Sequence, residues 1–170
     1  MISSKTKIRE IEENDAAEFL NLCKKIDSET DFMLREADER TATEEEQRNQ
    51  IKKIKAEDNQ MIFIAENDGS LVGYLAAFGG GFKRIRNTAH IVIGILQKFT
   101  GLGIGTELFV KMEKWAKQRK IHRLELTVRT DNEKGLALYK KMGFETEGVR
   151  KHALLINGSY MDEYRMFKLL

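Results

Sequence analysis

A glycine-rich segment near the middle of the sequence has the residue types and the spacing to bind an anion. Three glycines alternate with other residues between an apolar run and an amphipathic stretch. Glycine lacks a Cβ atom, so successive backbone N–H groups can turn toward one point, and a helix N-terminus adds partial positive charge there. We therefore expect a phosphate or diphosphate site, although the spacing alone also allows a plain glycine-rich turn. Its residues are Gly101, Leu102, Gly103, Ile104, Gly105 and Thr106.

Two common phosphate motifs do not fit this segment. A P-loop needs Gly-Lys-Ser or Gly-Lys-Thr at its end, but Gly105 is followed by Thr106 and Glu107, so nucleotide hydrolysis is disfavoured. A dinucleotide fingerprint that begins at Gly101 and Gly103 has Thr106 in place of its third glycine, and no early βαβ unit surrounds it. The segment therefore needs another explanation.

A second segment, residues 132–144, supplies that context. It reads Asn-Glu-Lys-Gly-Leu-Ala-Leu-Tyr-Lys-Lys-Met-Gly-Phe on an expected helix. Together the two segments resemble those of the GNAT superfamily of N-acetyltransferases. That family has Gln/Arg-x-x-Gly-x-Gly/Ala at a strand-to-helix junction and Asn-x-x-Ala-x-x-Leu-Tyr-x-x-x-Gly-Phe further on. Thr100 stands where the family usually has Arg or Gln, and Gly135 replaces the first alanine. The resemblance covers residues 61–170.

The resemblance implies a fold and a co-substrate. The fold would be a single α/β domain over residues 1–170, with a mixed, mostly antiparallel, twisted sheet of about six to seven strands and about four flanking helices. Acetyl-CoA would be the co-substrate, and no metal would be needed. In this family the strand before the loop splays from its neighbour at a bulge, which Gly94 suits, and its free backbone groups bind the pantetheine arm and the thioester. The matching residues are Ile93, Gly94, Ile95 and Leu96.

The resemblance also suggests catalytic side chains, each with a structural alternative. Tyr139 matches a tyrosine that protonates the departing thiolate, although it could serve only as aromatic packing. Asn132 matches a CoA-contacting asparagine or is simply a helix cap. His90 has the pKa range of a general base but could be structural, and Glu125 is expected to be a solvated surface carboxylate. In this family the acceptor amine attacks the thioester directly and no covalent acyl-enzyme is required. Cys23 is therefore expected to pack as a small apolar residue.

The expected reaction is transfer of the acetyl group to a primary amine of a small molecule, a polyamine or a peptide N-terminus. A non-catalytic CoA-binding sensor or assembly module is the alternative. In the family the acceptor enters between the early helices and the last hairpin, here residues 32–39 and 148–164. Carboxylates in this region could attract a cationic amine or be a solvated face; they are Glu29, Asp31, Glu36, Asp38 and Glu39. The last strands of such folds often pair between subunits, which is compatible with a homodimer.

The composition of the chain disfavours several other classes of protein. The 29 Lys and Arg and 27 Asp and Glu leave a net charge of +2, which lacks the broad footprint of a dedicated nucleic-acid binder. A third hypothesis, nucleic-acid binding, is therefore disfavoured; its residues would be Lys83, Arg84, Arg86, Lys117, Arg119 and Lys120. No apolar run of about 18 residues and no apolar signal near the N-terminus occur, so we expect no membrane span and a cytoplasmic location. One cysteine and three scattered histidines predict neither a disulfide nor a metal site.

Hydrophobic periodicity, turn residues and capping boxes predict the elements of one mixed α/β domain. Strands are expected at residues 5–11, 61–65, 71–78, 90–96, 124–128, 148–156 and 159–167. Helices are expected from residue 15 to about 27, after Thr43, from about 104 to 120, and from 131 to 142. Thr43 with Glu46 and Thr130 with Glu133 form the expected capping boxes. Asn157-Gly158 predicts a tight hairpin turn, and Gly143 predicts a helix end.

Overall fold

The computed structural model describes residues 6–170, so Lys5, the first residue of the expected N-terminal strand, lies outside the described part. The strands are β1 (Thr6–Glu10), β2 (Gln60–Asn67), β3 (Ser70–Gly79), β4 (Thr88–Ile95), β5 (Arg123–Arg129), β6 (Glu145–Ile156) and β7 (Ser159–Leu169). The helices are α1 (Ala16–Glu29), α2 (Glu44–Ala56), α3 (Ile104–Gln118) and α4 (Glu133–Lys141). The predicted order of strands and helices is confirmed.

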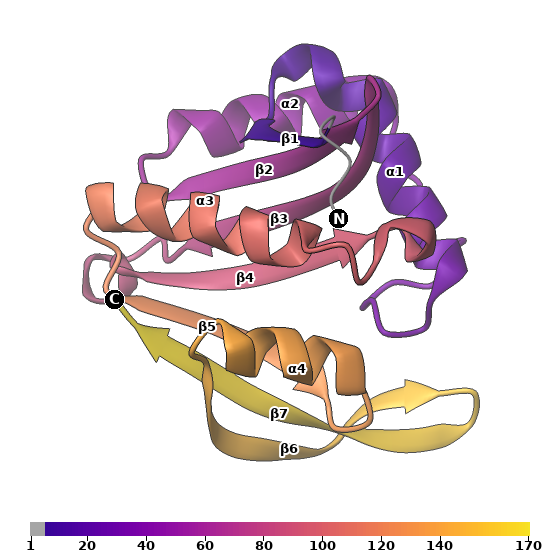
Figure 1. Ribbon diagram of the computed structural model, residues 1–170, viewed down its shortest axis with the longest axis vertical. Helices are drawn as coiled ribbons and strands as arrows, with labels where there is room; N and C mark the ends of the chain where they lie inside the picture. Colours follow the sequence, from indigo (N-terminus) through magenta and orange to yellow (C-terminus); the bar gives the residue numbers. More distant parts are fainter. Residues whose placement is uncertain (1–5) are drawn as a thin grey trace.

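The strands form one sheet in the order β1-β2-β3-β4-β5-β7-β6. All neighbouring pairs are antiparallel except β4 and β5, which are parallel. Helices cover both faces (Figure 1). Gly94 approaches Ile26 of α1, whereas a Cβ at Gly105 of α3 would meet Ile95. Since successive strand residues point to opposite faces, α1 and α3 lie on opposite sides of β4.

The core follows from the predicted periodicities. Ile104, Leu108, Met112 and Trp115 recur at helical spacing on α3, and all are buried. On β5 the alternation places Leu124, Leu126 and Val128 in the core. The ring of Trp115 meets Phe63 of β2 edge to face at a centroid distance of 5.8 Å, which joins α3 to the sheet.

Local turn and cap chemistry confirms most of the predicted boundaries. The Thr43 hydroxyl accepts a hydrogen bond from the Glu46 N–H at 3.2 Å, and the Glu46 carboxylate accepts one from the Thr43 N–H at 2.8 Å. The hairpin turn at Asn157 and Gly158 has φ values of 48° and 79°, as a type I′ turn requires. Gly143, with φ 86°, ends α4.

The capping box expected at Thr130 is wrong. Helix α4 begins at Glu133, and its N-cap is Asn132, whose side-chain oxygen accepts a hydrogen bond from the Gly135 N–H at 3.0 Å. The Thr130 N–H instead donates to the Asp162 carbonyl of β7 at 3.1 Å. Thr130 is thus held beside the sheet, and the helix starts two residues later than predicted.

Candidate functional site

The parallel strands β4 and β5 separate soon after they meet. Their register contains only Thr88 with Arg123, Ala89 with Leu124 and His90 with Glu125. On its other side β4 stays paired with β3 as far as Ile95. Residues 91–95 of β4 therefore have no strand partner on the side of β5, as the expected splay requires.

The direction of the free backbone groups follows from one hydrogen bond. The Leu96 N–H donates to the Val72 carbonyl of β3 at 2.9 Å. Because backbone groups alternate in direction along a strand, those of Gly94 also point to β3, and those of Ile93 and Ile95 point to the open side. Among the four predicted backbone contacts, only Ile93 and Ile95 thus present free N–H and C=O groups there.

The bulge expected at Gly94 is absent from the described ladder. The register between β3 and β4 runs without a shift through Tyr74 and Gly94. Glycine is needed for another reason, since a Cβ there would lie 3.0 Å from Tyr74 Cε1 and 3.2 Å from Ile26 Cδ1. Gly94 lets α1 and Tyr74 pack closely against β4, and the strands diverge without a local irregularity.

The glycine-rich segment follows β4 and forms a concentration of unpaired donors. Gly101 and Gly103 have φ values of 75° and 85°, a left-handed conformation that favours glycine. In the described residues, no backbone acceptor is found for the N–H groups of residues 101–106, and the next N–H, of Glu107, donates to Gly103 at 3.1 Å. Six successive donors at the N-terminus of α3 fit a diphosphate. We call residues 101–106 the phosphate loop.

Gly105 connects the phosphate loop to the second segment. A Cβ at Gly105 would lie 2.8 Å from Leu138 Cδ2 of α4 and 3.5 Å from Ile95 Cδ1 of β4. The absence of a side chain lets the three elements meet. The structure therefore brings the two family-like segments together beside the open edge of β4.

Thr100 does not present its side chain as a donor to the phosphate loop. Its hydroxyl donates to the Gln97 carbonyl at 2.8 Å. Gln97 in turn donates through its backbone N–H to the Glu29 carboxylate at 2.8 Å and through its side chain to the Glu29 carbonyl at 2.6 Å. The approach to the phosphate loop is thus tied to the end of α1.

Tyr139 lies in an aromatic cluster of α3 and α4. Its side chain is buried, with 9% of the residue exposed, and its ring meets Phe109 edge to face at 6.0 Å and Phe144 at 6.2 Å. Burial raises the pKa of the Tyr139 phenol to about 12, which keeps the hydroxyl protonated at neutral pH. The Tyr139 ring therefore has the expected packing role, and its contacts with Phe109 and Phe144 hold it in place.

Asn132 also has the structural role that was its alternative, because its side chain caps α4. A Cβ at Gly135 would lie 2.8 Å from Asn132 Nδ2. The glycine that replaces the usual alanine therefore leaves room for the capping side chain. The Asn132 carboxamide keeps its N–H donors for a further partner, since the cap uses only the oxygen.

His90 lies at the last paired position before β4 and β5 separate; it is accessible to solvent, although neighbouring atoms crowd part of its ring. Partial burial lowers the pKa of His90, while the carboxylates of Glu125 and Glu163 act in the opposite direction. Glu125 accepts a hydrogen bond from Arg123 Nε at 3.1 Å. Glu125 is therefore engaged rather than free.

Residues 29–32 bridge the ends of the two separated strands. Glu29 holds Gln97 after β4, while Arg129 at the end of β5 donates to the Asp31 carbonyl at 3.1 Å and lies 4.6 Å from the centroid of the Phe32 ring. Arg129 is 7% exposed and also binds the Asp131 carboxylate at 2.7 and 3.0 Å. Sequence reasoning missed Arg129, because its partner in the strap, Asp31, lies 98 positions away in the chain. We call residues 29–32 the strap.

A second ion pair fixes the chain beyond the strap. Arg40 Nε lies 2.7 Å from Asp27 Oδ2, and the Asp27 side chain is 1% exposed. Nearby, Cys23 is buried as expected, and burial raises the pKa of its thiol to about 11. The thiol is therefore protonated at neutral pH, which agrees with a packing role.

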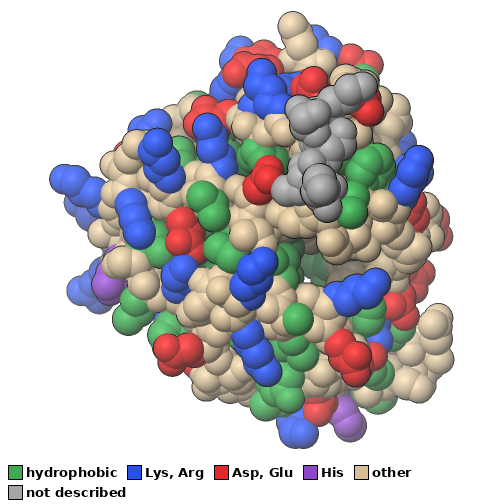
Figure 2. All heavy atoms as spheres, viewed as in Figure 1, with side chains coloured by type: hydrophobic (Ala, Val, Ile, Leu, Met, Phe, Trp, Pro, Cys, Tyr) green, Lys and Arg blue, Asp and Glu red, His purple; other side chains and the backbone are tan. Residues whose placement is uncertain are grey.

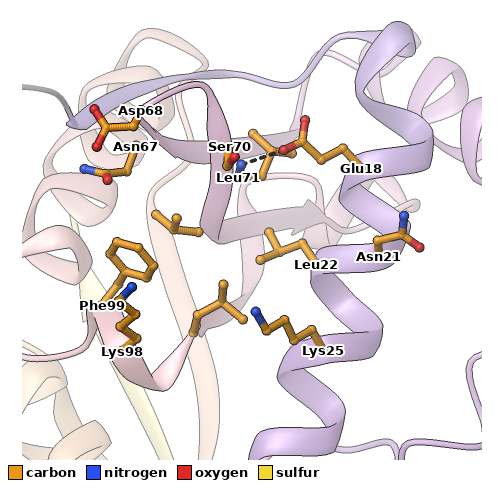
Figure 3. Close-up of a pocket in the computed structure, with 12 residues that line it drawn as sticks. Glu18, Asn21, Leu22, Lys25, Asn67, Asp68, Ser70, Leu71, Lys98 and Phe99 are labelled. Carbon is orange, nitrogen blue, oxygen red and sulfur yellow. Dashed lines mark hydrogen bonds between the residues drawn. The ribbon is translucent and has the colours of Figure 1, made fainter.

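A pocket of about 610 Å³ lies between α1, the turn joining β2 to β3, and residues 96–99. Figure 3 shows Lys25 reaching from α1 toward Lys98 and Phe99, and the Glu18 carboxylate accepting the Leu71 N–H. The pocket shares only Leu96 with the predicted site residues. It is thus separate from the open edge of β4.

The structure describes residues 6–170. Within this range, no group of three or more His, Cys, Asp or Glu side chains is placed to hold a metal ion. None of the helices described is long and apolar enough to cross a membrane.

Comparison with known proteins fits this geometry. The acetyltransferase (GNAT) family matches residues 24–144. The crystal structure of a GNAT-family acetyltransferase from Streptococcus pneumoniae is 33% identical, with a TM-score of 0.95 over 98% of this chain and 100% of that one. The chain therefore belongs to the acetyltransferase (GNAT) family, and the expected α/β fold is confirmed.

A curated relative and a second solved structure are also similar to this chain. The L-amino acid N-acetyltransferase AaaT of Escherichia coli is 34% identical over 110 residues, which cover 62% of this chain and 66% of that protein. The match thus spans slightly less than two thirds of the curated relative. The structure of yncA from Salmonella typhimurium with its cofactor acetyl-CoA has a TM-score of 0.87 at 17% identity, covering 98% of this chain and 95% of that one. At that identity the likeness is evidence for the fold alone.

Proposed function

We propose that this protein is an acetyl-CoA-dependent N-acetyltransferase that transfers the acetyl group to a primary amine in a ternary complex. One observation carries the proposal: the phosphate loop, whose six N–H groups find no backbone acceptor among the described residues, lies five residues beyond a strand whose edge is open toward β5. The first feature fits a diphosphate, and the second fits an extended amide-containing arm. Coenzyme A contains both groups in this order.

The chain's own groups would hold the co-substrate as follows. The phosphate loop takes the diphosphate through backbone donors, with no side-chain help from Thr100. Ile93 and Ile95 offer their free N–H and C=O groups to the pantetheine amides, as a neighbouring strand would. Asn132 adds its amide donors from the start of α4. The backbone N–H of Ile93 or Ile95 can also polarise the thioester carbonyl.

The reaction needs two proton movements around one bond exchange. Acetyl-CoA supplies the thioester; the neutral amine attacks its carbonyl carbon, a C–N bond forms, and the C–S bond breaks. His90 takes a proton from the ammonium form of the acceptor through water, which generates the free amine. Tyr139 donates a hydrogen bond to the departing sulfur. After the attack the nitrogen carries one proton more than the amide product, and transfer of that proton to the sulfur lets coenzyme A leave as the thiol. No covalent acyl-enzyme is formed.

The acceptor enters beside the ends of β4 and β5, where the strap lies. Three of the five carboxylates expected to attract a cation are engaged, since Glu29, Asp31 and Glu39 accept hydrogen bonds or ion pairs within the chain. A cationic acceptor is thus not specially favoured over an amino acid. AaaT, which acts on L-amino acids by its name, gives the amino-acid class priority in a screen.

The test is acetyl transfer followed by release of free thiol and by mass spectrometry of the product. L-Amino acids, polyamines and peptides with free N-termini serve as acceptors. We expect acetylation of at least one class, with thiol release that depends on the acceptor. Acetyl-CoA binding without transfer to any of them would favour the non-catalytic sensor instead.

A further inference from the structure

We propose that the end of the molecule opposite the phosphate loop binds single-stranded RNA. The surface consists of the loop at residues 79–87, before β4, and the segment at residues 117–122, which contains the end of α3 and the turn after it. Strand β4 begins at this end and reaches the phosphate loop at the other. With eight residues at about 3.3 Å each, β4 separates the two sites by roughly 26 Å. The proposal does not depend on the acetyltransferase activity.

The loop at residues 79–87 is held in one shape by a buried side chain. Asn59 Nδ2 donates to the carbonyls of Gly80 and Arg86, each at 3.1 Å, and the Asn59 carbonyl accepts from the Gly79 N–H at 2.9 Å. A Cβ at Gly79 would lie 2.2 Å from Asn59 Nδ2, and one at Gly80 would lie 2.4 Å from the Ile85 carbonyl. Both glycines are therefore required, and the loop is closed and well packed at its base.

This fixed loop presents apolar side chains to solvent. Phe82 is 80% exposed and Ile85 is 48% exposed, and Lys83 and Arg84 between them are exposed as well. Folding gains little from a phenylalanine in that position, because its ring buries almost no surface. A preorganised loop that exposes an aromatic ring between cations is typical of a binding surface.

The end of α3 adds the exposed cation Lys117, and the turn after it adds Arg119 and Lys120. The N–H groups of His122 and Arg123 both donate to the Asn87 carbonyl, at 2.8 and 3.1 Å, which places this turn next to the loop. Figure 2 shows blue side chains at this end of the molecule, on the left of the view.

These cations have no ion-pair partner in the described part of the chain. Over residues 6–170, no carboxylate forms an ion pair with Lys83, Arg84, Lys117, Arg119 or Lys120. Arg86 is excluded from the surface because it pairs with Asp58. The net charge of +2 argued against nucleic-acid binding by the whole chain, but it does not describe this one end, where five cations adjoin.

The chemistry of the surface favours a single strand of RNA. Adjacent cations replace the counterions of successive phosphates, and an exposed ring offers a face on which an unpaired base can stack. A duplex would hide its bases from Phe82. An acidic protein segment would satisfy the cations but would not need the ring.

The experiment measures binding of a fluorescein-labelled, mixed-sequence 12-nucleotide RNA by fluorescence anisotropy at several salt concentrations. Five phosphate contacts predict a slope of log K against log salt of about −3.5, or about a 100-fold loss between 50 and 200 mM salt. Lys83→Ala with Arg84→Ala should reduce that slope by about 1.4. Phe82→Ala should weaken binding about 5-fold or more with the slope unchanged.

Lys24→Ala with Lys25→Ala is the matched control, since it removes two exposed cations from α1, whose next residue, Ile26, packs against Gly94 near the other end of β4. We expect this variant to bind RNA as the wild type does. Equal losses in both double variants, or no salt-dependent binding at 50 mM, would overturn the proposal. Binding of an acidic peptide but not of the RNA would overturn it as well, and would point to a protein partner. Unchanged far-UV circular dichroism confirms that each variant is folded.

Discussion

Tyr139 has an observed structural role beside its proposed catalytic one. Its ring is locked by Phe109 and Phe144, and burial raises its pKa to about 12. A phenol with that pKa is a weaker acid than the one expected from sequence, so its help to the leaving sulfur is a hydrogen bond more than a completed proton transfer. The ring and the hydroxyl can be separated experimentally, because phenylalanine keeps the packing.

Tyr139→Phe should lower kcat about 10-fold or more, since general acids contribute roughly 100-fold to 10,000-fold and part of that is lost with a weakened donor. The affinity for acetyl-CoA should change little. Steady-state kinetics with calorimetric binding of acetyl-CoA measures both. Unchanged kcat would remove Tyr139 from the mechanism, and an unfolding midpoint near that of the wild type would show that the ring packing is intact.

His90 can be tested through the pH dependence of kcat/KM. Burial lowers its pKa below the usual 6.5, so the neutral, proton-accepting form predominates from a lower pH than for an ordinary histidine. We expect kcat/KM to rise with pH on a limb whose midpoint lies below 6.5, and His90→Gln to abolish that limb. A profile that His90→Gln leaves unchanged would assign the base to another group.

At the scale of elements, the site arises where β4, α3 and α4 meet. The left-handed glycines turn the chain from β4 into α3 and leave six donors unpaired. Gly105 then allows α4 to approach through Leu138. The phosphate loop is thus a product of backbone conformation, and a substitution that alters that conformation should affect binding.

Gly101→Ala and Gly69→Ala form a matched pair. Both glycines have positive φ, 75° and 80°, and a Cβ would meet nothing within 4 Å at either. Each substitution should cost about 1–2 kcal/mol of unfolding free energy, because a non-glycine residue is strained there. Only Gly101→Ala should weaken acetyl-CoA binding. Calorimetry and urea denaturation check this pair, and equal effects on binding would contradict the role of the phosphate loop.

The sequence predicted these elements well where the signal was local. The Thr43 cap, the Asn157-Gly158 turn and the helix end at Gly143 each depend on a few neighbouring residues. The failures have non-local causes. Thr130 is held by β7, and Gly94 is required by close packing against Tyr74 and Ile26, not by a bulge.

Contacts between residues far apart in the chain also limited what the sequence could predict of the site. The phosphate loop and the α4 segment are continuous in sequence, so a motif could find them. The strap joins Glu29 to Gln97 and Asp31 to Arg129, which are 68 and 98 positions apart. No periodicity records such contacts, and an arginine at a strand end gives no indication of its partner.

On the scale of the whole molecule, the sheet has two parts joined by a short ladder. Three residue pairs connect β4 to β5, after which the strands diverge. The strap, Arg129 and the buried pair of Asp27 and Arg40 close the α1 side of that opening. The opening the proposed reaction needs is therefore stabilised by contacts far from the reacting atoms.

Arg40→Met should cost about 3–5 kcal/mol of unfolding free energy, because it leaves the Asp27 carboxylate buried without its partner. Asp27→Leu combined with Arg40→Met should cost less, since no buried charge remains. Urea denaturation of both variants measures the difference. A double variant as unstable as Arg40→Met would show that the loss comes from packing and not from the unpaired charge.

A calorimetric titration of the wild-type protein with acetyl-CoA tests the proposed coenzyme A site and requires no knowledge of the acceptor. Saturable binding with a Kd near or below about 100 μM, equivalent to roughly −5.5 kcal/mol, is the predicted result. Absence of binding at millimolar acetyl-CoA would contradict the assignment of the phosphate loop and the open edge of β4 as a coenzyme A site.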